Sequence, residues 1–261
     1  MISIRLRYKS LIFVLLYFLC IVSSGCHTSS QVKEKRVGID PSWFPLAIAG
    51  RESNITGFST ELLKEIGKIE KISITKLTVN WDDLVEGLQK GKYEAILSSM
   101  PPYTFNLQTY DFSELYLFTG PVLMVSTASK IDSLKMTNGK EIAVLPETKG
   151  TFLLEKYPGV IIRNYDSIPR ALNDVVNGTV DGAILDVLSA VAFCQDLYQG
   201  KLKIATDILN NEGLRMLTLH GDAHDLILHF NRGLEKLKSS GTYDKLLLKW
   251  NLKEKCSDKS K

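Results

Sequence analysis

The sequence predicts an α/β protein made of two similar lobes, and two matching stretches of chain are the main reason. Residues 93–99 (Tyr-Glu-Ala-Ile-Leu-Ser-Ser) and 180–186 (Val-Asp-Gly-Ala-Ile-Leu-Asp) each follow an amphipathic run that stops at a glycine, Gly91 or Gly178. Such a glycine ends a helix, because it accepts the left-handed conformation that closes the last turn. The apolar runs that follow are short and fit buried parallel strands. Because ligands bind at the carboxyl ends of strands in open α/β sheets, each lobe is expected to offer a strand end to a shared cleft.

Length and charge limit the class of protein. The 261 residues suffice for one large domain or two modest ones with an ample core. The formal net charge is +3, and Arg5, Arg7 and Lys9 account for all of it, since the first 25 residues hold no acid. The rest of the chain is neutral and lacks the excess of basic residues that a nucleic-acid-binding face requires, so no nucleic-acid partner is expected.

Residues 1–26 are predicted to be a secretion signal. A basic start is followed by an apolar stretch at 11–22 and by Ser-Ser-Gly-Cys at 23–26. The apolar stretch is short for a membrane span, which takes about 20 residues. The end of the segment resembles a bacterial lipoprotein signal, in which Cys26 would be lipidated and anchor the protein at the membrane; plain secretion is the alternative. Residues 27–35 would be a polar tether, and the protein is expected in the periplasm or cell envelope.

The first lobe is predicted to begin with residues 36–119. Its first strand ends at Asp40, because the loop at 41–45 contains two prolines, which lack the donor for a strand ladder. Ser59 or Thr60 is expected to cap the next helix, and an aspartate beside Trp81 to cap the helix after it. The predicted order is a strand at 36–40, a helix opening at 57–61, a strand at 72–79, a helix from 81, a strand at 94–99 and a loop at 101–106.

The second lobe is predicted at residues 120–213, because Gly120-Pro121 interrupts an apolar run that is long for one strand. Ser167 is expected to cap a helix with Pro169 in its first turn. Residues 214–252 would return to the first lobe and close it, and 253–261 would form a charged tail. Two crossings between the lobes favour a hinge with a cleft between the halves. The remaining predicted elements are strands at 140–144, 160–162, 180–186 and 214–219, and helices at 152–157, 225–239 and 241–250.

With these parts in order, the chain resembles the bacterial extracellular solute-binding proteins of family 3, the amino-acid receptors of ABC importers such as the glutamine- and arginine-binding proteins. The resemblance implies a type II periplasmic-binding-protein-like fold, with two lobes joined by two crossover strands. It also implies a receptor that captures an amino acid or a close relative by hinge closure and passes it to a membrane permease. The segments that carry the resemblance are 37–40, 57–58, 81–84, 88–94, 111–113, 177–181 with Asp186, and 237–243.

The resemblance also implies which residues contact the ligand. The ligand side chain would lie between Trp43 and Trp81, and its ammonium would donate hydrogen bonds to Asp186. An ammonium in a dry cleft needs an ionised acceptor, and such charge-assisted bonds are strong. The other implied contacts are Ser98, Ser99, Pro101, Thr148 and Lys149 around the ligand carboxylate, and Asp40 at the ligand side chain.

One position departs from the family pattern. Typical members carry a threonine and then an arginine in the loop after the first-lobe strand, and these positions fall here on Pro101 and Asn106. Asparagine cannot supply the charged, bidentate fork with which an arginine holds a carboxylate. Losing such a pair would cost roughly 2–5 kcal/mol if the ligand kept its carboxylate there. Either the ligand lacks a carboxylate at that spot or another cation takes the role, and Lys149 is the candidate.

Other functions compete with the receptor. Some relatives on the same fold are periplasmic dehydratases of prephenate or arogenate, for which Glu61 or Glu147 could supply an acid; a sensor role is also open. Three histidines, His220, His224 and His229, suggest a metal site, but only the first two have helical spacing and no cysteine lies near. No metal and no cofactor are therefore expected.

Overall fold

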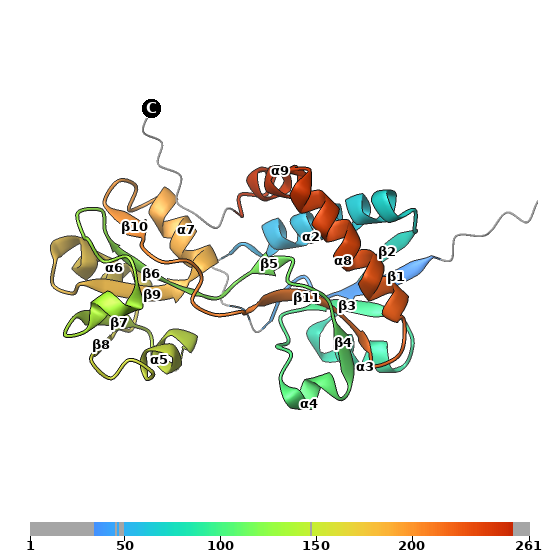
Figure 1. Cartoon of the computed structure of the whole chain (residues 1–261), viewed down its shortest axis with the longest axis horizontal. Helices are drawn as coiled ribbons and strands as arrows, with labels where there is room; N and C mark the ends of the chain where they lie inside the picture. The colour runs from blue at the N-terminus through green and yellow to red at the C-terminus, as the bar shows by residue number, and fades with distance from the viewer. Residues whose placement is uncertain (1–33, 45, 47–49, 147, 253–261) are drawn as a thin grey trace, which may run out of the picture. The chain divides into compact units, whose positions relative to one another are not determined.

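The computed structural model describes residues 34–252, except residues 45, 47–49 and 147 (Figure 1). The predicted signal, residues 27–33 of the tether and the tail at 253–261 lie outside the described residues. Within the described part of the chain, no helix combines the length and the apolar character that crossing a membrane would require.

The first of two sheets has six strands in the order β2-β1-β3-β11-β4, with β5 paired to β11. Strand β1 runs parallel to β2 and β3, and β11 is antiparallel to β3. The predicted strand at 214–219 is therefore present, and it returns beside β3. The strands are β1 (Lys35–Ile39), β2 (Ile74–Thr78), β3 (Ala95–Ser98), β4 (Tyr110–Phe112), β5 (Leu117–Phe118) and β11 (Gly213–Leu219). This sheet and its helices are called lobe 1.

Helices cover both faces of the lobe 1 sheet. Figure 1 shows α2 (Glu52–Glu70), α8 (His224–Ser239) and α9 (Thr242–Lys249) on one side and α3 (Trp81–Gln89) on the other. Phe58 and Phe230 pack with Met216 on the first face, while Leu84 packs with Leu217 on the second. Alternate β11 side chains thus enter two separate cores, as the pleat of a strand requires. A short helix, α4 (Thr104–Leu107), overlaps the second half of the segment 101–106 that was predicted as a loop.

The predicted start of α2 is wrong. The helix begins at Glu52, well before the expected caps at Ser59 and Thr60. The Ser59 hydroxyl instead forms a buried hydrogen bond of 3.0 Å with the Tyr116 hydroxyl, and the Thr60 hydroxyl donates to the backbone oxygen of Thr56. The cap predicted for α3 is also wrong, because Asn80 is the N-cap residue and the aspartates lie in the first turn.

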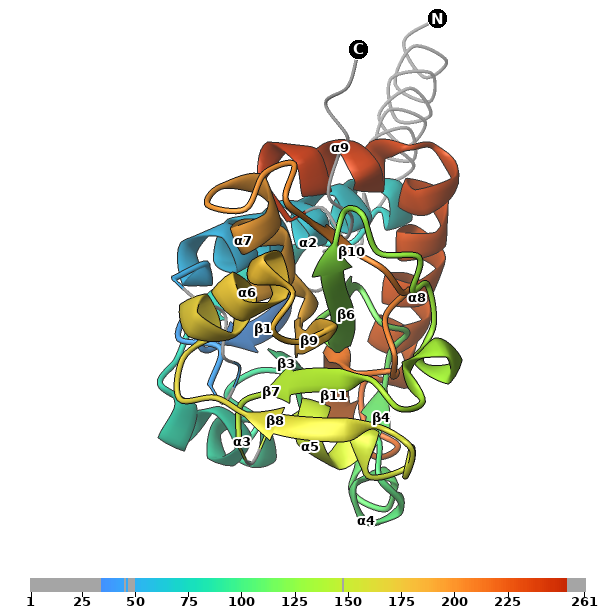
Figure 2. The same cartoon turned by 90° about the vertical axis from the view of Figure 1, so that its left-hand side faces the viewer.

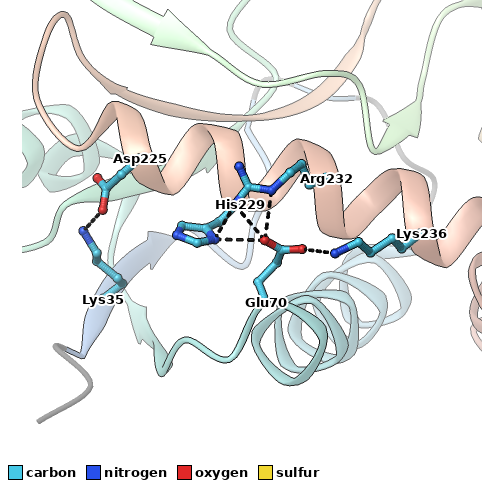
Figure 3. A network of polar contacts seen from close by, with 6 residues as sticks. All are labelled: Lys35, Glu70, Asp225, His229, Arg232 and Lys236. Carbon is cyan, nitrogen blue, oxygen red and sulfur yellow. Dashed lines mark hydrogen bonds and ion pairs between the residues drawn. The ribbon is translucent and has the colours of Figure 1, made fainter. Parts of the chain in front are cut away.

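The end of α2 is tied to α8 by one buried carboxylate. The Glu70 side chain is 5% exposed and accepts hydrogen bonds from Arg232 Nη2 (2.9 Å) and Lys236 Nζ (2.7 Å), with His229 Nδ1 at 2.9 Å (Figure 3). These contacts lower the pKa of Glu70 from 4.5 to about 2; the Lys236 hydrogen bond has the largest effect. We call Glu70 and these three cationic or titratable partners the Glu70 network.

The second sheet has five strands in the order β10-β6-β9-β7-β8. Strand β7 is parallel to β8 and β9, and β6 is antiparallel to β9. The strands are β6 (Pro121–Ser126), β7 (Glu141–Val144), β8 (Ile161–Asn164), β9 (Gly182–Asp186) and β10 (Leu202–Ile204). The helices are η1 (Leu134–Thr137), α5 (Lys149–Leu154), α6 (Ile168–Asn177) and α7 (Val187–Gln195) (Figure 2). This sheet and its helices are called lobe 2.

The two sheets repeat one plan, as the matching stretches of sequence predicted. Strand β3 lies between parallel β1 and antiparallel β11, and β9 lies between parallel β7 and antiparallel β6. The helix before β9 closes at Gly178, which has the left-handed φ of 75°. The α/β fold with two similar sheets is confirmed.

Two short connections join the sheets, at residues 119–120 and 205–212. They are hydrogen-bonded to each other, since Thr119 N donates to the Glu212 oxygen at 3.0 Å. The second connection also bonds to the start of β6, where Leu209 N donates to the Pro121 oxygen at 2.9 Å. A side chain at Gly120 would force Asn210 to move, because a Cβ there would lie 2.1 Å from Asn210 Oδ1. The Gly-Pro interruption seen in the sequence is therefore the point where the first connection enters lobe 2.

Candidate functional site

A cavity of about 290 Å³ opens in lobe 1 at the carboxyl end of β3. It lies where β3 ends, α3 begins and β11 begins. This edge of the sheet is the expected place for a ligand in an open α/β fold. The lining includes Trp81, Ser99, Pro101, Tyr103, Glu212 and Arg215. We call it the lobe 1 pocket.

Trp81 supplies an aromatic ring to the lining of the lobe 1 pocket. Trp81 is the first residue of α3 and is partly buried. The Phe44 ring contacts it edge-on, with ring centroids 5.2 Å apart, and Phe44 is 55% exposed. Such edge-to-face pairs are favourable beyond the area that they bury. The exposed face of this pair is suited to an apolar or planar ligand group.

The strand end supplies polar groups beside this ring. Ser98 is buried, and its hydroxyl accepts a hydrogen bond of 3.1 Å from Met100 N, which fixes the turn after β3. Ser99 and Pro101 follow it and line the pocket. The Asn106 carboxamide donates to the Pro101 backbone oxygen at 2.8 Å, so it braces the loop that carries the lining residues.

Asp40 and Trp43 are buried and are not among the residues that line the lobe 1 pocket. Asp40 is 5% exposed and accepts hydrogen bonds from the backbone N and the hydroxyl of Ser42, at 3.0 and 2.5 Å. Trp43 is 3% exposed, packs in the main core and donates from Nε1 to the Thr56 hydroxyl at 2.9 Å. The structure therefore pairs Trp81 with Phe44, and it places Trp43 in the core.

The predicted second-lobe residues lie at two helix starts. Asp186 ends β9, is partly buried and is the N-cap residue of α7, where its side chain makes no capping hydrogen bond. Thr148 is the N-cap residue of α5, and its hydroxyl donates to the Leu145 oxygen at 2.7 Å. The Lys149 side chain lies outside the described residues, as does Glu147.

Sequence reasoning missed Arg215 on β11, which lines the lobe 1 pocket. It is partly buried, and its Nη1 donates to the Ser113 backbone oxygen at 2.9 Å. Burial lowers the pKa of the guanidinium, and the Glu114 carboxylate partly offsets this effect. A single charged residue inside the apolar run Leu-Arg-Met-Leu at 214–217 was the signal that could have identified it.

The histidines considered for a metal site contact acids. His220 Nδ1 lies 2.8 Å from Asp111, His224 Nδ1 lies 3.5 Å from the same carboxylate, and His229 belongs to the Glu70 network. Over the described ranges, no three His, Cys, Asp or Glu side chains are grouped to hold a metal ion.

Two α/β lobes joined by two connections, with a pocket at the carboxyl end of a central strand, form the architecture that the resemblance implied. The family model for bacterial extracellular solute-binding proteins, family 3, matches residues 36–253, so the chain belongs to this family. The resemblance found in the sequence is thereby confirmed.

Curated relatives cover most of the chain at low identity. The chain is 26% identical over 220 residues to a "Probable histidine-binding protein" of Campylobacter jejuni, spanning 83% of this chain and 84% of that protein. It is 23% identical to the L-cystine-binding protein TcyJ of Escherichia coli, with 85% of each chain covered. It is 24% identical to the arginine-binding extracellular protein ArtP of Bacillus subtilis, covering 89% and 92% of the two chains.

Solved structures share the fold. The unliganded, open L-cystine solute receptor of Neisseria gonorrhoeae matches with a TM-score of 0.70 at 19% identity, over 86% of this chain and 95% of that chain. The second substrate-binding domain of Lactococcus lactis GlnP, also in an open conformation, matches with a TM-score of 0.63 at 21% identity, over 83% and 94%. The predicted type II periplasmic-binding-protein-like fold is confirmed.

Proposed function

We propose that this protein is the substrate-binding receptor of an ABC importer and captures an amino acid or a close relative. The observation that carries the proposal is the family match over residues 36–253, joined to relatives named for histidine, cystine and arginine. The lobe 1 pocket supports it, because an aromatic ring beside polar groups suits a small ligand with an apolar part and charged ends.

In this proposal the ligand contacts both lobes. Its side chain lies against the Trp81 and Phe44 rings, and its polar end reaches Ser99 in lobe 1. Asp186, with the α5 start at Thr148 and Lys149, supplies the contacts from lobe 2, where Asp186 accepts hydrogen bonds from the ligand ammonium. Asp40, Trp43, Ser98 and Asn106 hold the loops that present the pocket. The connections at 119–120 and 205–212 act as the hinge, and a membrane permease receives the ligand-bound form.

The N-terminal segment supports a location at the cell envelope, with lipidation of Cys26 as the membrane anchor. The support is the sequence pattern of residues 1–26. Cys26→Ala should release the protein from the membrane fraction without changing its affinity for the ligand. Membrane retention of this variant would contradict the anchor.

The dehydratase alternative has less support. Glu61, one candidate acid, accepts hydrogen bonds from Lys249 Nζ and from Trp250 Nε1 at 2.7 Å, in the contact between α2 and α9. It does not line the lobe 1 pocket in the described structure. The relatives found are solute-binding proteins. Formation of phenylpyruvate from prephenate, followed by its absorbance, would establish the enzyme instead.

The receptor is tested by thermal shift and tryptophan fluorescence on protein lacking residues 1–26. The panel contains L-histidine, L-arginine, L-cystine and L-glutamine, with sugars as the comparison class. We expect at least one amino acid to raise the melting temperature and to change the emission of Trp81. Trp81→Phe should keep the thermal shift and lose most of the emission change, whereas Trp250→Phe, a change in the α9 region, should keep both. A chain that responds to sugars and to no amino acid would refute the proposal.

A further inference from the structure

The lobe 1 pocket contains a cation that neither the family pattern nor the sequence reasoning assigned to it. Arg215 lies on β11 directly opposite Ser98 on β3, in an antiparallel pair. Side chains of directly opposed residues project from the same face of a sheet. Arg215 is therefore held at the carboxyl end of β3, next to the turn that carries Ser99, and it lines the cavity there.

The two sides of β11 explain why this arginine is fixed. Leu214 and Met216, its chain neighbours, are completely buried in the main core, so they prevent the strand from rotating. The guanidinium is anchored by its 2.9 Å hydrogen bond to the Ser113 oxygen. A guanidinium has five N–H donors, and a single anchoring bond leaves donors over for a ligand.

Arg215 makes no ion pair in the described part of the chain, and the Glu212 carboxylate lines the same pocket. In the part of the chain that the structure describes, no carboxylate lies within ion-pair distance of the guanidinium; Glu114 acts on it from further away. Burial removes hydration from the charged form and thereby lowers its pKa. An arginine stays charged at neutral pH, so an anion entering the pocket would recover the lost interaction.

The other groups considered for a carboxylate are less suited. Asn106 is neutral, and its amide already donates to the Pro101 oxygen. Among the described residues that line the pocket, Arg215 is the sole cation. Its planar fork also matches the two oxygens of a carboxylate, which a single ammonium does not.

We propose that Arg215 is the carboxylate-binding residue of the lobe 1 pocket and holds the acid end of the ligand. This inference rests on the proposed receptor function and specifies it. The ligand then carries a free carboxylate next to the group that packs on Trp81. Amines without a carboxylate are poor ligands, and Arg215 sets this selectivity.

The test uses the full-length chain in detergent and two matched pairs of probes. The pairs are L-arginine with its decarboxylated form agmatine, and L-histidine with histamine, measured by calorimetry. The variants are Arg215→Met, which keeps most of the stem, Arg215→Lys, which keeps the charge, and Arg170→Met as a charge-matched control. Arg170 is a suitable control because its side chain is 70% exposed and pairs with Asp166 in lobe 2.

For any amino acid that the wild type binds, we expect the decarboxylated partner to bind about 30-fold or more weakly, the loss that follows from removing one member of a buried charge pair. Arg215→Met should weaken the binding of the amino acid by a similar factor and leave the affinity for the amine unchanged. The amino-acid affinity of Arg215→Lys should lie between those of the wild type and Arg215→Met, and Arg170→Met should bind with wild-type affinity. Equal affinity of a folded Arg215→Met variant for the amino acid, or equal binding of both members of a pair by the wild type, would overturn the assignment.

A second measurement separates this inference from the receptor proposal. Acetate is titrated while the side-chain Nε–Hε signal of Arg215 is followed by NMR, with Arg215→Lys used to assign the signal. A saturable shift without amino-acid binding would refute the receptor function and keep Arg215 as an anion site. No shift and no amino-acid binding would refute both.

Discussion

Replacing Glu70 by glutamine is expected to destabilise lobe 1 in a pH-dependent way. The Glu70 carboxylate lies between α2 and α8, with contacts of 2.7 to 2.9 Å to Lys236, Arg232 and His229 (Figure 3). Glutamine keeps the size of the side chain and removes its charge. The variant therefore removes the ion pairs between these two helices and leaves one acceptor oxygen at this position.

The magnitude follows from the pKa of Glu70. Its depression from 4.5 to about 2 corresponds to roughly 3 kcal/mol, at about 1.4 kcal/mol for each pH unit. Arg232 and Lys236 are about half exposed, so solvent screening reduces the expected loss to about 1–2 kcal/mol. Because the folded-state pKa lies below the unfolded value, this stability is present above about pH 5 and is lost as the pH falls toward 2.

The assay is urea denaturation of the wild type and of Glu70→Gln at pH 7, and again at steps down to pH 3. We expect the difference in unfolding free energy to be about 1–2 kcal/mol at pH 7 and to shrink steadily on acidification. Glu235→Gln is the matched control, because Glu235 lies exposed on α8 and should change stability by less than about 0.5 kcal/mol. A Glu70→Gln effect as small as the control, or one that does not depend on pH, would refute the reasoning.

Three further substitutions test the site and its scaffold. Phe44→Ala should weaken amino-acid binding about 3- to 10-fold, the effect of one lost aromatic contact. The melting temperature should not fall, since Phe44 is 55% exposed. Calorimetry measures the affinity, and an unchanged affinity would contradict a ligand contact at the Phe44–Trp81 pair. Gly57→Val should destabilise the protein by about 1–3 kcal/mol, because a Cβ at this position would lie 2.2 Å from the Trp250 ring; urea denaturation showing no loss would contradict the packing. Asp186→Asn should weaken amino-acid binding about 30-fold. Asp181→Asn, which removes a contact to Lys140, should leave the affinity unchanged. Equal affinities in both variants would show that Asp186 does not contact the ligand.

The central strands could be predicted because their signals are local. A glycine that closes a helix and an apolar run that follows it are adjacent in the sequence, and both strands appear in the same position of their sheets. The Gly-Pro interruption at 120–121 was predictable for the same reason, since proline lacks a ladder donor. Strand β10 (Leu202–Ile204) is only three residues long, too short for a periodic pattern.

The start of α2 could not be predicted, because distant residues determine it. Gly57 followed by Ser59 and Thr60 has the composition of a helix start. The Trp250 ring packs over Gly57, and the Tyr116 hydroxyl forms a hydrogen bond with Ser59. Gly57 and Ser59 therefore make tertiary contacts from within the helix and do not lie at its start. Tertiary packing overrides local preference here, and neither partner is near in the sequence.

The loop after β1 shows a difference in environment between neighbouring residues that the sequence could not reveal. Trp43 and Phe44 are adjacent aromatic residues, and the sequence does not say which of them is buried. Trp43 adopts a left-handed φ of 54°, which is uncommon for a large side chain. Burial of its ring in the core and the Nε1 bond to Thr56 stabilise that conformation, and Phe44 is then the residue left beside Trp81.

The proposed assignments divide the two charges of an amino acid between the lobes. Arg215 would hold the carboxylate from lobe 1, and Asp186 would accept the ammonium from lobe 2. A ligand that carries both groups gains its second ion pair only when both lobes contact it. An amine or a simple carboxylate forms one ion pair with one lobe, so it does not stabilise contact between the lobes. A ligand shifts an equilibrium only by its difference in affinity for the two states. The separation of these charges is therefore a physical reason why a zwitterion would favour a closed receptor more strongly than an amine or a carboxylate alone.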